Sequence, residues 1–278
     1  MQYTDRATRQ GSGETMADRE TWKDLAKGYR ANIVVWIDQS SDQRLREENR
    51  GGVCRTVTKN WVDAYMDSRP ARAQFVNAFR ENGIPEEYID EQEQYALDIK
   101  VHNSMLIGAK VLQKISMDKK FLSSTVNTIK QSQAELHPGT VTKYPKGSAI
   151  QPILQQIAKL EGYTMFSFRP KDSDVGHVVG FEVRPDLKEQ MSENFPNGLF
   201  EFIDANLGLF VFKSARTMVE FFYLEVWKKL YAKSFAGCSF AVEHFVVEPG
   251  SGLGEESNQD DDVDDEELLK ELEKLTNQ

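Results

Sequence analysis

The 278-residue sequence contains little cysteine, and what it has excludes a disulfide framework. Cys54 and Cys238 are its two cysteines, and neither belongs to a CxxC pair of the kind that binds zinc or exchanges electrons. We therefore expect no metal and no cofactor. A reducing compartment suits such a chain, and a thiol that stays reduced is available as a nucleophile.

Long apolar runs are also missing. The longest, such as residues 33–37 and 207–212, fall far short of the roughly 20 residues that cross a bilayer. The N-terminus has no apolar segment of the classical secretory type. We expect no transmembrane segment, and any secretion must use a route without a classical signal peptide.

The main body of the chain has no excess of positive charge. Residues 248–278 carry 12 acidic and 2 basic residues, which leaves 32 of each sign in residues 1–247. Because phosphate binding needs concentrated Lys and Arg, a neutral body argues against a nucleic-acid partner. The acidic tail is typical of a solvated, disordered extension. Alternatively, its leucine-bearing end folds on a partner such as an export chaperone or a host protein.

Composition divides the chain into three parts. Residues 1–18 are polar and predict a disordered segment. Residues 19–247 predict one domain, in which a helical lobe to about residue 160 precedes a sheet lobe over about residues 161–247. Residues 248–278 form the acidic tail.

Hydrophobic spacing and turn residues predict the elements of the domain. Helices are expected at 54–66, throughout 70–135, at 149–160 and at 215–232. Strands are expected at 163–168, 177–183, 199–203, 209–212 and 239–247, and loops at 39–53 and 138–145. Helices followed by short strands joined by Gly, Pro and Asn turns indicate an α+β fold with an antiparallel sheet.

Three residues in this arrangement match one chemistry. Cys54 follows two glycines and begins a helix, where the helix dipole favours a thiolate. His177 begins a strand, and imidazole is the natural base for a thiol at neutral pH. Asp204 ends the next strand, where a carboxylate can orient the imidazole. Singly, each of these residues is more often structural, but their chain order and local structure together predict a papain-like Cys-His-Asp triad with a cleft between two lobes.

The blocks that hold these residues resemble the YopT/AvrPphB family of bacterial effector cysteine peptidases. The resemblance rests on Gly52-Val53-Cys54 followed by Asn60-Trp61, on Gly176-His177 opening a strand, and on the turn Asp204-Ala205-Asn206-Leu207-Gly208 with its flanking aromatics. It implies a papain-like fold and a thiol peptidase that acts as a virulence effector or toxin. It also implies a host-cell protein substrate and delivery into the host cytoplasm.

The implied mechanism needs two donors to the oxyanion. The backbone N–H of Cys54 supplies one, and an upstream side-chain amide supplies the other, for which Asn49 is the first candidate and Gln43 the second. Two alternatives stay open. The same triad performs deamidation, transglutamination and acyl transfer on related folds, and an inactive relative serves as a binding adaptor.

Overall fold

The computed structural model describes residues 19–47, 52–67, 69–115, 127–128, 131, 139–170, 176–184 and 200–246. The elements in chain order are α1 (Arg19–Gly28), β1 (Asn32–Val35), α2 (Gln43–Glu47), α3 (Cys54–Asp67), α4 (Arg69–Asn82), α5 (Glu86–Ile115), β2 (Thr140–Tyr144), α7 (Ile150–Ile157), β3 (Gly162–Arg169), β4 (His177–Val183), β5 (Phe200–Asp204), β6 (Gly208–Phe212), α9 (Ala215–Phe221), the π-helix η1 (Phe222–Tyr231) and β7 (Ser239–Phe245). The predicted N-terminal segment, the acidic tail and most of the region 116–138 lie outside the described residues.

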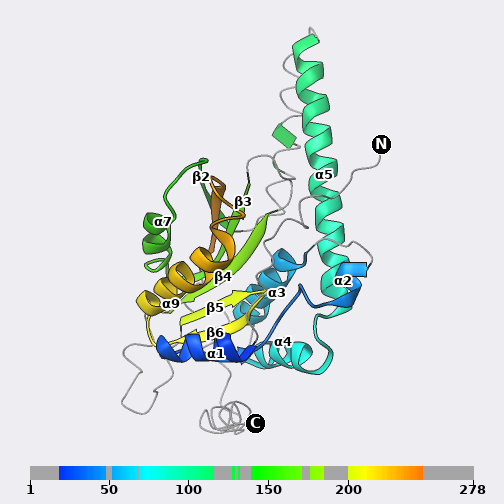
Figure 1. The fold of residues 1–278 in the computed structure, drawn as a ribbon. Helices are drawn as coiled ribbons and strands as arrows, with labels where there is room; N and C mark the ends of the chain where they lie inside the picture. The colour runs from blue at the N-terminus through cyan, green and yellow to red at the C-terminus, as the bar shows by residue number, and fades with distance from the viewer. Residues whose placement is uncertain are drawn as a thin grey trace, which may run out of the picture.

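One sheet organises the described part of the chain (Figure 1). Its seven strands lie in the order β1-β6-β5-β4-β3-β7-β2, and all neighbouring pairs are antiparallel. The predicted combination of helices with an antiparallel sheet is confirmed. Two strands, β1 and β2, come from the part of the chain that the sequence assigned to the helical lobe, so the division into lobes stays a prediction.

Three local predictions differ from the structure. The expected loop at 138–145 contains the edge strand β2, which pairs with β7. Most of β2 is exposed on both faces, so it has no apolar alternation to reveal it. The expected loop at 39–53 contains the short helix α2. The expected helix at 215–232 changes at Phe222 from α to π hydrogen bonding.

Both faces of the sheet are covered. Phe166 and Phe168 of β3 pack into one core with residues of α1, α7, α9 and η1. Tyr163 and Met165 alternate with them and pack into a second core with α3 and α4. Figure 1 shows the central sheet with helices on its two sides. Because side chains of a strand alternate between faces, this burial on both sides explains why the central strands β4 and β5 are mostly apolar.

The helix α3 is anchored on the sheet by Trp61. Its indole is fully buried and contacts the rings of Tyr65 and Tyr163. This packing fixes the position of Cys54 at the start of α3. Within the described residues, no helix combines the length and the apolar character that a membrane crossing requires.

Candidate active site

The topology brings Cys54, His177 and Asp204 together. Cys54 is the first residue of α3, His177 is the first residue of β4, and Asp204 is the last residue of β5. The strands β4 and β5 are antiparallel neighbours, with Val179 opposite Asp204, so the start of one strand lies beside the end of the other. All three side chains are buried: Cys54 is 7% exposed, His177 5% and Asp204 0%.

His177 and Asp204 are directly hydrogen bonded. The Nε2 atom of His177 lies 2.9 Å from Oδ1 of Asp204. The same oxygen accepts the backbone N–H of Asn206 at 2.9 Å. The imidazole is also flanked by the rings of Phe168 and Tyr231, whose centroids lie 5.4 Å and 4.8 Å from its own. The ring is thus held both by its hydrogen bond and by packing.

The charge of Cys54 and a side-chain interaction with it both act on the His177 ring. Since Nε2 faces Asp204, Nδ1 is the nitrogen left for the sulfur. Burial alone lowers the pKa of His177, but the charges of Asp204 and Cys54 and the hydrogen bonds from both raise it to about 10. The site therefore favours a protonated imidazole beside the sulfur, the arrangement that a thiolate–imidazolium pair requires.

The backbone before Cys54 is held by a side chain that the sequence did not single out. The Oε1 atom of Gln39 accepts the backbone N–H of Val53 at 2.8 Å. A Cβ at Gly52 would lie 3.0 Å from that same oxygen, which explains the need for a small residue there. The first helical hydrogen bond, from Val57 N–H to the Val53 carbonyl, then starts α3 at the cysteine.

Tyr231 is a second residue that sequence reasoning missed. It ends the π-helix η1, and its hydroxyl donates to Oδ2 of Asp204 at 2.7 Å. The hydroxyl oxygen lies 3.0 Å from Nε2 of His177 and accepts from Nδ2 of Asn206 at 2.9 Å. Asn206 thus contacts a neighbour of the candidate site. A spacing of 54 residues between His177 and Tyr231 offers no local signal.

Neither of the two predicted side-chain donors to the oxyanion has a described contact with Cys54, His177 or Asp204. Asn49 lies outside the described residues. Gln43 is the first residue of α2, and its side chain is exposed. Both assignments stay predictions.

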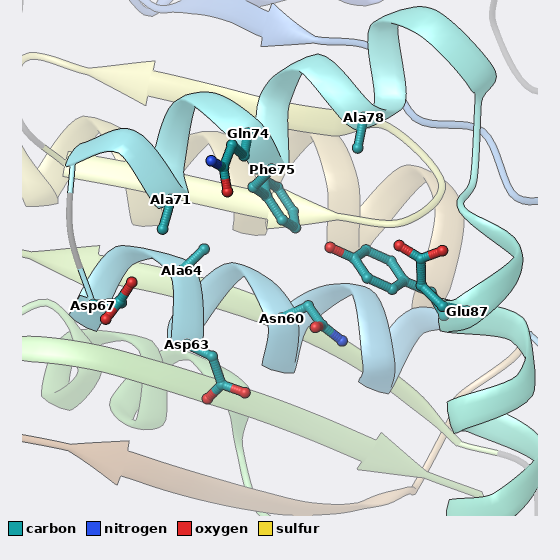
Figure 2. Close-up of a pocket in the computed structure, with 10 residues that line it drawn as sticks. Asn60, Asp63, Ala64, Asp67, Ala71, Gln74, Phe75, Ala78 and Glu87 are labelled. Carbon is teal, nitrogen blue, oxygen red and sulfur yellow. The ribbon is translucent and has the colours of Figure 1, made fainter.

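A separate groove of about 480 Å³ lies where α3, α4 and the start of α5 meet (Figure 2). Its lining is mostly polar and acidic and consists of Asn60, Asp63, Ala64, Asp67, Ala71, Gln74, Phe75, Ala78, Glu87 and Tyr88. The lining includes none of the three candidate catalytic residues. Lys59 donates to Asp63 at 2.5 Å and so neutralises part of the negative charge that lines the groove. The groove is therefore not the candidate active site.

Metal-binding chemistry has no obvious location among the described residues. No group of three or more His, Cys, Asp or Glu side chains in that part of the chain is placed to hold an ion. His102 and His244 each bond a backbone carbonyl, at 2.7 Å.

Comparison with known proteins finds a distant structural similarity. No protein-family profile matches the sequence, and no curated protein matches it. The crystal structure of the Pseudomonas avirulence protein AvrPphB is similar to this structure with a TM-score of 0.41 and 15% sequence identity, covering 76% of this chain and 96% of that chain. A likeness at this level does not by itself indicate function, so the functional argument rests on the geometry of the site.

Proposed function

We propose that this protein is a cysteine hydrolase, and specifically a peptidase, with Cys54 as nucleophile, His177 as general base and acid, and Asp204 as the residue that orients the imidazole. The observation that carries the proposal is the buried hydrogen bond of 2.9 Å between Nε2 of His177 and Oδ1 of Asp204. Cys54, at the start of α3, interacts with the same ring. A nucleophile beside a base that a carboxylate orients is the recurring signature of covalent catalysis.

The proposed reaction has two halves. In the first, the Cys54 thiolate attacks the carbonyl carbon of an amide, and the backbone N–H of Cys54 donates to the resulting oxyanion. The His177 imidazolium then gives its proton to the leaving amine, and a thioester remains on the sulfur. In the second, His177 takes a proton from water, the hydroxide attacks the thioester, and the carboxylic acid leaves while the Cys54 thiolate and the His177 imidazolium are restored.

The biological setting is part of the proposal and rests on the sequence resemblance. We propose a bacterial effector that is exported without a classical signal peptide and cleaves a protein inside a host cell. The acidic tail is the proposed contact for an export chaperone or another partner. Deamidation, transglutamination and acyl transfer remain the alternative reactions, since they use the same three groups.

The test is mass spectrometry of target-cell proteins treated with the native chain and, in parallel, with its Cys54→Ala variant. A new N-terminus that appears only with the native chain supports a peptidase. A one-dalton mass gain at glutamine supports a deamidase and overturns the peptidase assignment. An acyl or amine adduct indicates a transferase.

A non-catalytic adaptor is tested separately by thiol labelling with iodoacetamide, a reagent small enough for the limited exposure of Cys54. Cys238 is the internal control, because it is buried and burial raises the pKa of its thiol. Cys54 is expected to react at least about tenfold faster at neutral pH. Equal rates at the two cysteines would contradict an activated nucleophile.

A further inference from the structure

We infer that Tyr231 is a positioning residue for the candidate active site and that Asn206 and Gln39 tie it to the backbone that carries Cys54. The inference rests on the proposed function for its catalytic consequence. Its structural basis is a continuous chain of hydrogen bonds whose members come from five separate segments of the sequence.

The Tyr231 hydroxyl has all of its hydrogen-bonding capacity in use. A hydroxyl offers one proton and two lone pairs. Its proton goes to Oδ2 of Asp204 at 2.7 Å. Its oxygen accepts from Nδ2 of Asn206 at 2.9 Å and lies 3.0 Å from Nε2 of His177. With its one proton committed to Asp204, the oxygen can meet Nε2 only as an acceptor, so the histidine must carry its proton there.

This arrangement selects one tautomer of His177. The N–H at Nε2 faces two acceptors, Oδ1 of Asp204 and the hydroxyl oxygen of Tyr231. The proton is held at Nε2, and Nδ1 is left to exchange a proton with the Cys54 sulfur. With Asp204 as its single acceptor, the imidazole could still rock about that hydrogen bond. A second acceptor on a different element restrains the orientation of the ring plane as well. Such orientation of the base is the role that a third residue plays in catalytic triads.

The chain continues from Tyr231 to the nucleophile. Asn206 accepts the Nε2–H of Gln39 on its side-chain oxygen at 2.9 Å, and Gln39 accepts the Val53 N–H at 2.8 Å. The backbone N–H of Gln39 also donates to the Ala205 carbonyl at 2.9 Å. The peptide that precedes the cysteine and the turn that follows Asp204 are therefore joined by three hydrogen bonds. A displacement of either partner is transmitted to the other through short, partly buried contacts.

The experiment is an NMR titration of histidine in the full-length chain, native and with Tyr231→Phe. The sequence contains four histidines, so the His177 signal is assignable by its loss in a His177→Gln variant. The charged groups that face His177 are Asp204 and Cys54, and the variant leaves both in place. Because the hydroxyl oxygen lies 3.0 Å from Nε2 and stabilises the charge of the imidazolium, its removal is expected to lower the titration midpoint of His177 by about one pH unit. An unchanged midpoint overturns the inference.

The matched control is Tyr223→Phe, which removes a hydroxyl from the same helix at a ring that contacts Lys228. This control is expected to leave the His177 midpoint in place. Where a protein substrate is available, Tyr231→Phe is expected to lower kcat about tenfold or more with little change in KM, since it disturbs the base and not the substrate contacts. A lowered midpoint without any hydrolysis by the native chain would support the positioning role and contradict the peptidase.

A measurement on a protein with an intact Tyr231 covers the case in which Tyr231→Phe does not fold. In the Cys54→Ala variant, nitrogen chemical shifts of neutral His177 report which ring nitrogen carries the proton. The inference predicts the proton on Nε2. A proton on Nδ1 would require the Tyr231 hydroxyl to turn away from Asp204, and that outcome refutes the proposed role.

Discussion

A Cβ atom at Gly180 would lie 2.6 Å from Cζ3 of Trp61, so the helix that carries Cys54 rests directly on the backbone of the strand that begins with His177. Thr58 of the same helix and Ile203 of β5 close the space around this glycine, at 2.9 Å and 2.6 Å. The separation of nucleophile and base is thus set by the absence of a side chain three residues after the histidine.

Gly180→Ala is expected to push α3 away from β4, because contacts of this length require a shift of the neighbouring atoms. Overpacking of this kind costs about 1–3 kcal/mol. The variant should unfold at lower urea concentration, and Cys54 should react more slowly with iodoacetamide at pH 7. The control is Gly28→Ala, where a Cβ would meet no atom within 4 Å. Native-like reactivity of Cys54 in a destabilised Gly180→Ala protein would show that helix position does not control the thiol.

Asp204→Asn is expected to lower the pKa of His177 from about 10. A carboxylate beside an imidazolium favours the charged ring, and its loss typically lowers such a pKa by about 1–3 pH units. In the native chain, hydrolysis should persist at alkaline pH and fall near pH 10, where the imidazolium loses the proton that the leaving amine needs. In the variant this fall should begin at lower pH. The pH dependence of kcat/KM measures both, with the exposed Asp24→Asn as control.

The second oxyanion donor can be identified by substitution. Removing a side-chain donor to an oxyanion typically lowers kcat about 100- to 1000-fold. Asn49→Ala is expected to show this loss, and Gln43→Ala is the next candidate. Gln39→Ala serves as a comparison, because its amide holds the Val53 N–H and its loss should also destabilise the fold. A large fall in kcat for Gln39→Ala at unchanged stability would transfer the assignment to that residue.

The three candidate catalytic residues could be predicted because each lies where a local pattern changes. Cys54 begins an amphipathic helix after two glycines, His177 begins an apolar strand, and Asp204 ends the next strand before a turn that contains an asparagine and a glycine. Antiparallel neighbours necessarily place the start of one strand beside the end of the other. Because the histidine starts one strand and the aspartate ends the next, antiparallel pairing of these strands is enough to place both residues at the same end of the sheet.

Tyr231 and Gln39 could not be predicted in the same way. Residues 222–231 have the apolar spacing of an ordinary helix, but the Ala232 N–H bonds the Trp227 carbonyl, five residues earlier. This wider winding rotates each following side chain away from the face that a 3.6-residue period assigns. Gln39 lies in a segment predicted only as a polar loop, and its partners Val53 and Asn206 are distant in sequence. Such contacts form only when segments that are distant in sequence pack together, so no local pattern predicts them.

Glu201→Gln is expected to stabilise the protein at alkaline pH. Glu201 lies opposite Glu182 across β5 and β4, and burial raises its pKa to about 7. In the unfolded chain the pKa of a glutamate is about 4.3, so between these values the folded state holds more protons and its stability falls as pH rises. Glutamine avoids this loss and can still accept the Trp61 N–H. Urea unfolding should show a gain of about 2 kcal/mol at pH 8 and almost none at pH 4, whereas Glu220→Gln at the surface should show no such dependence. A variant less stable than the native chain at pH 8 would mean that the ionised carboxylate is required by its neighbours.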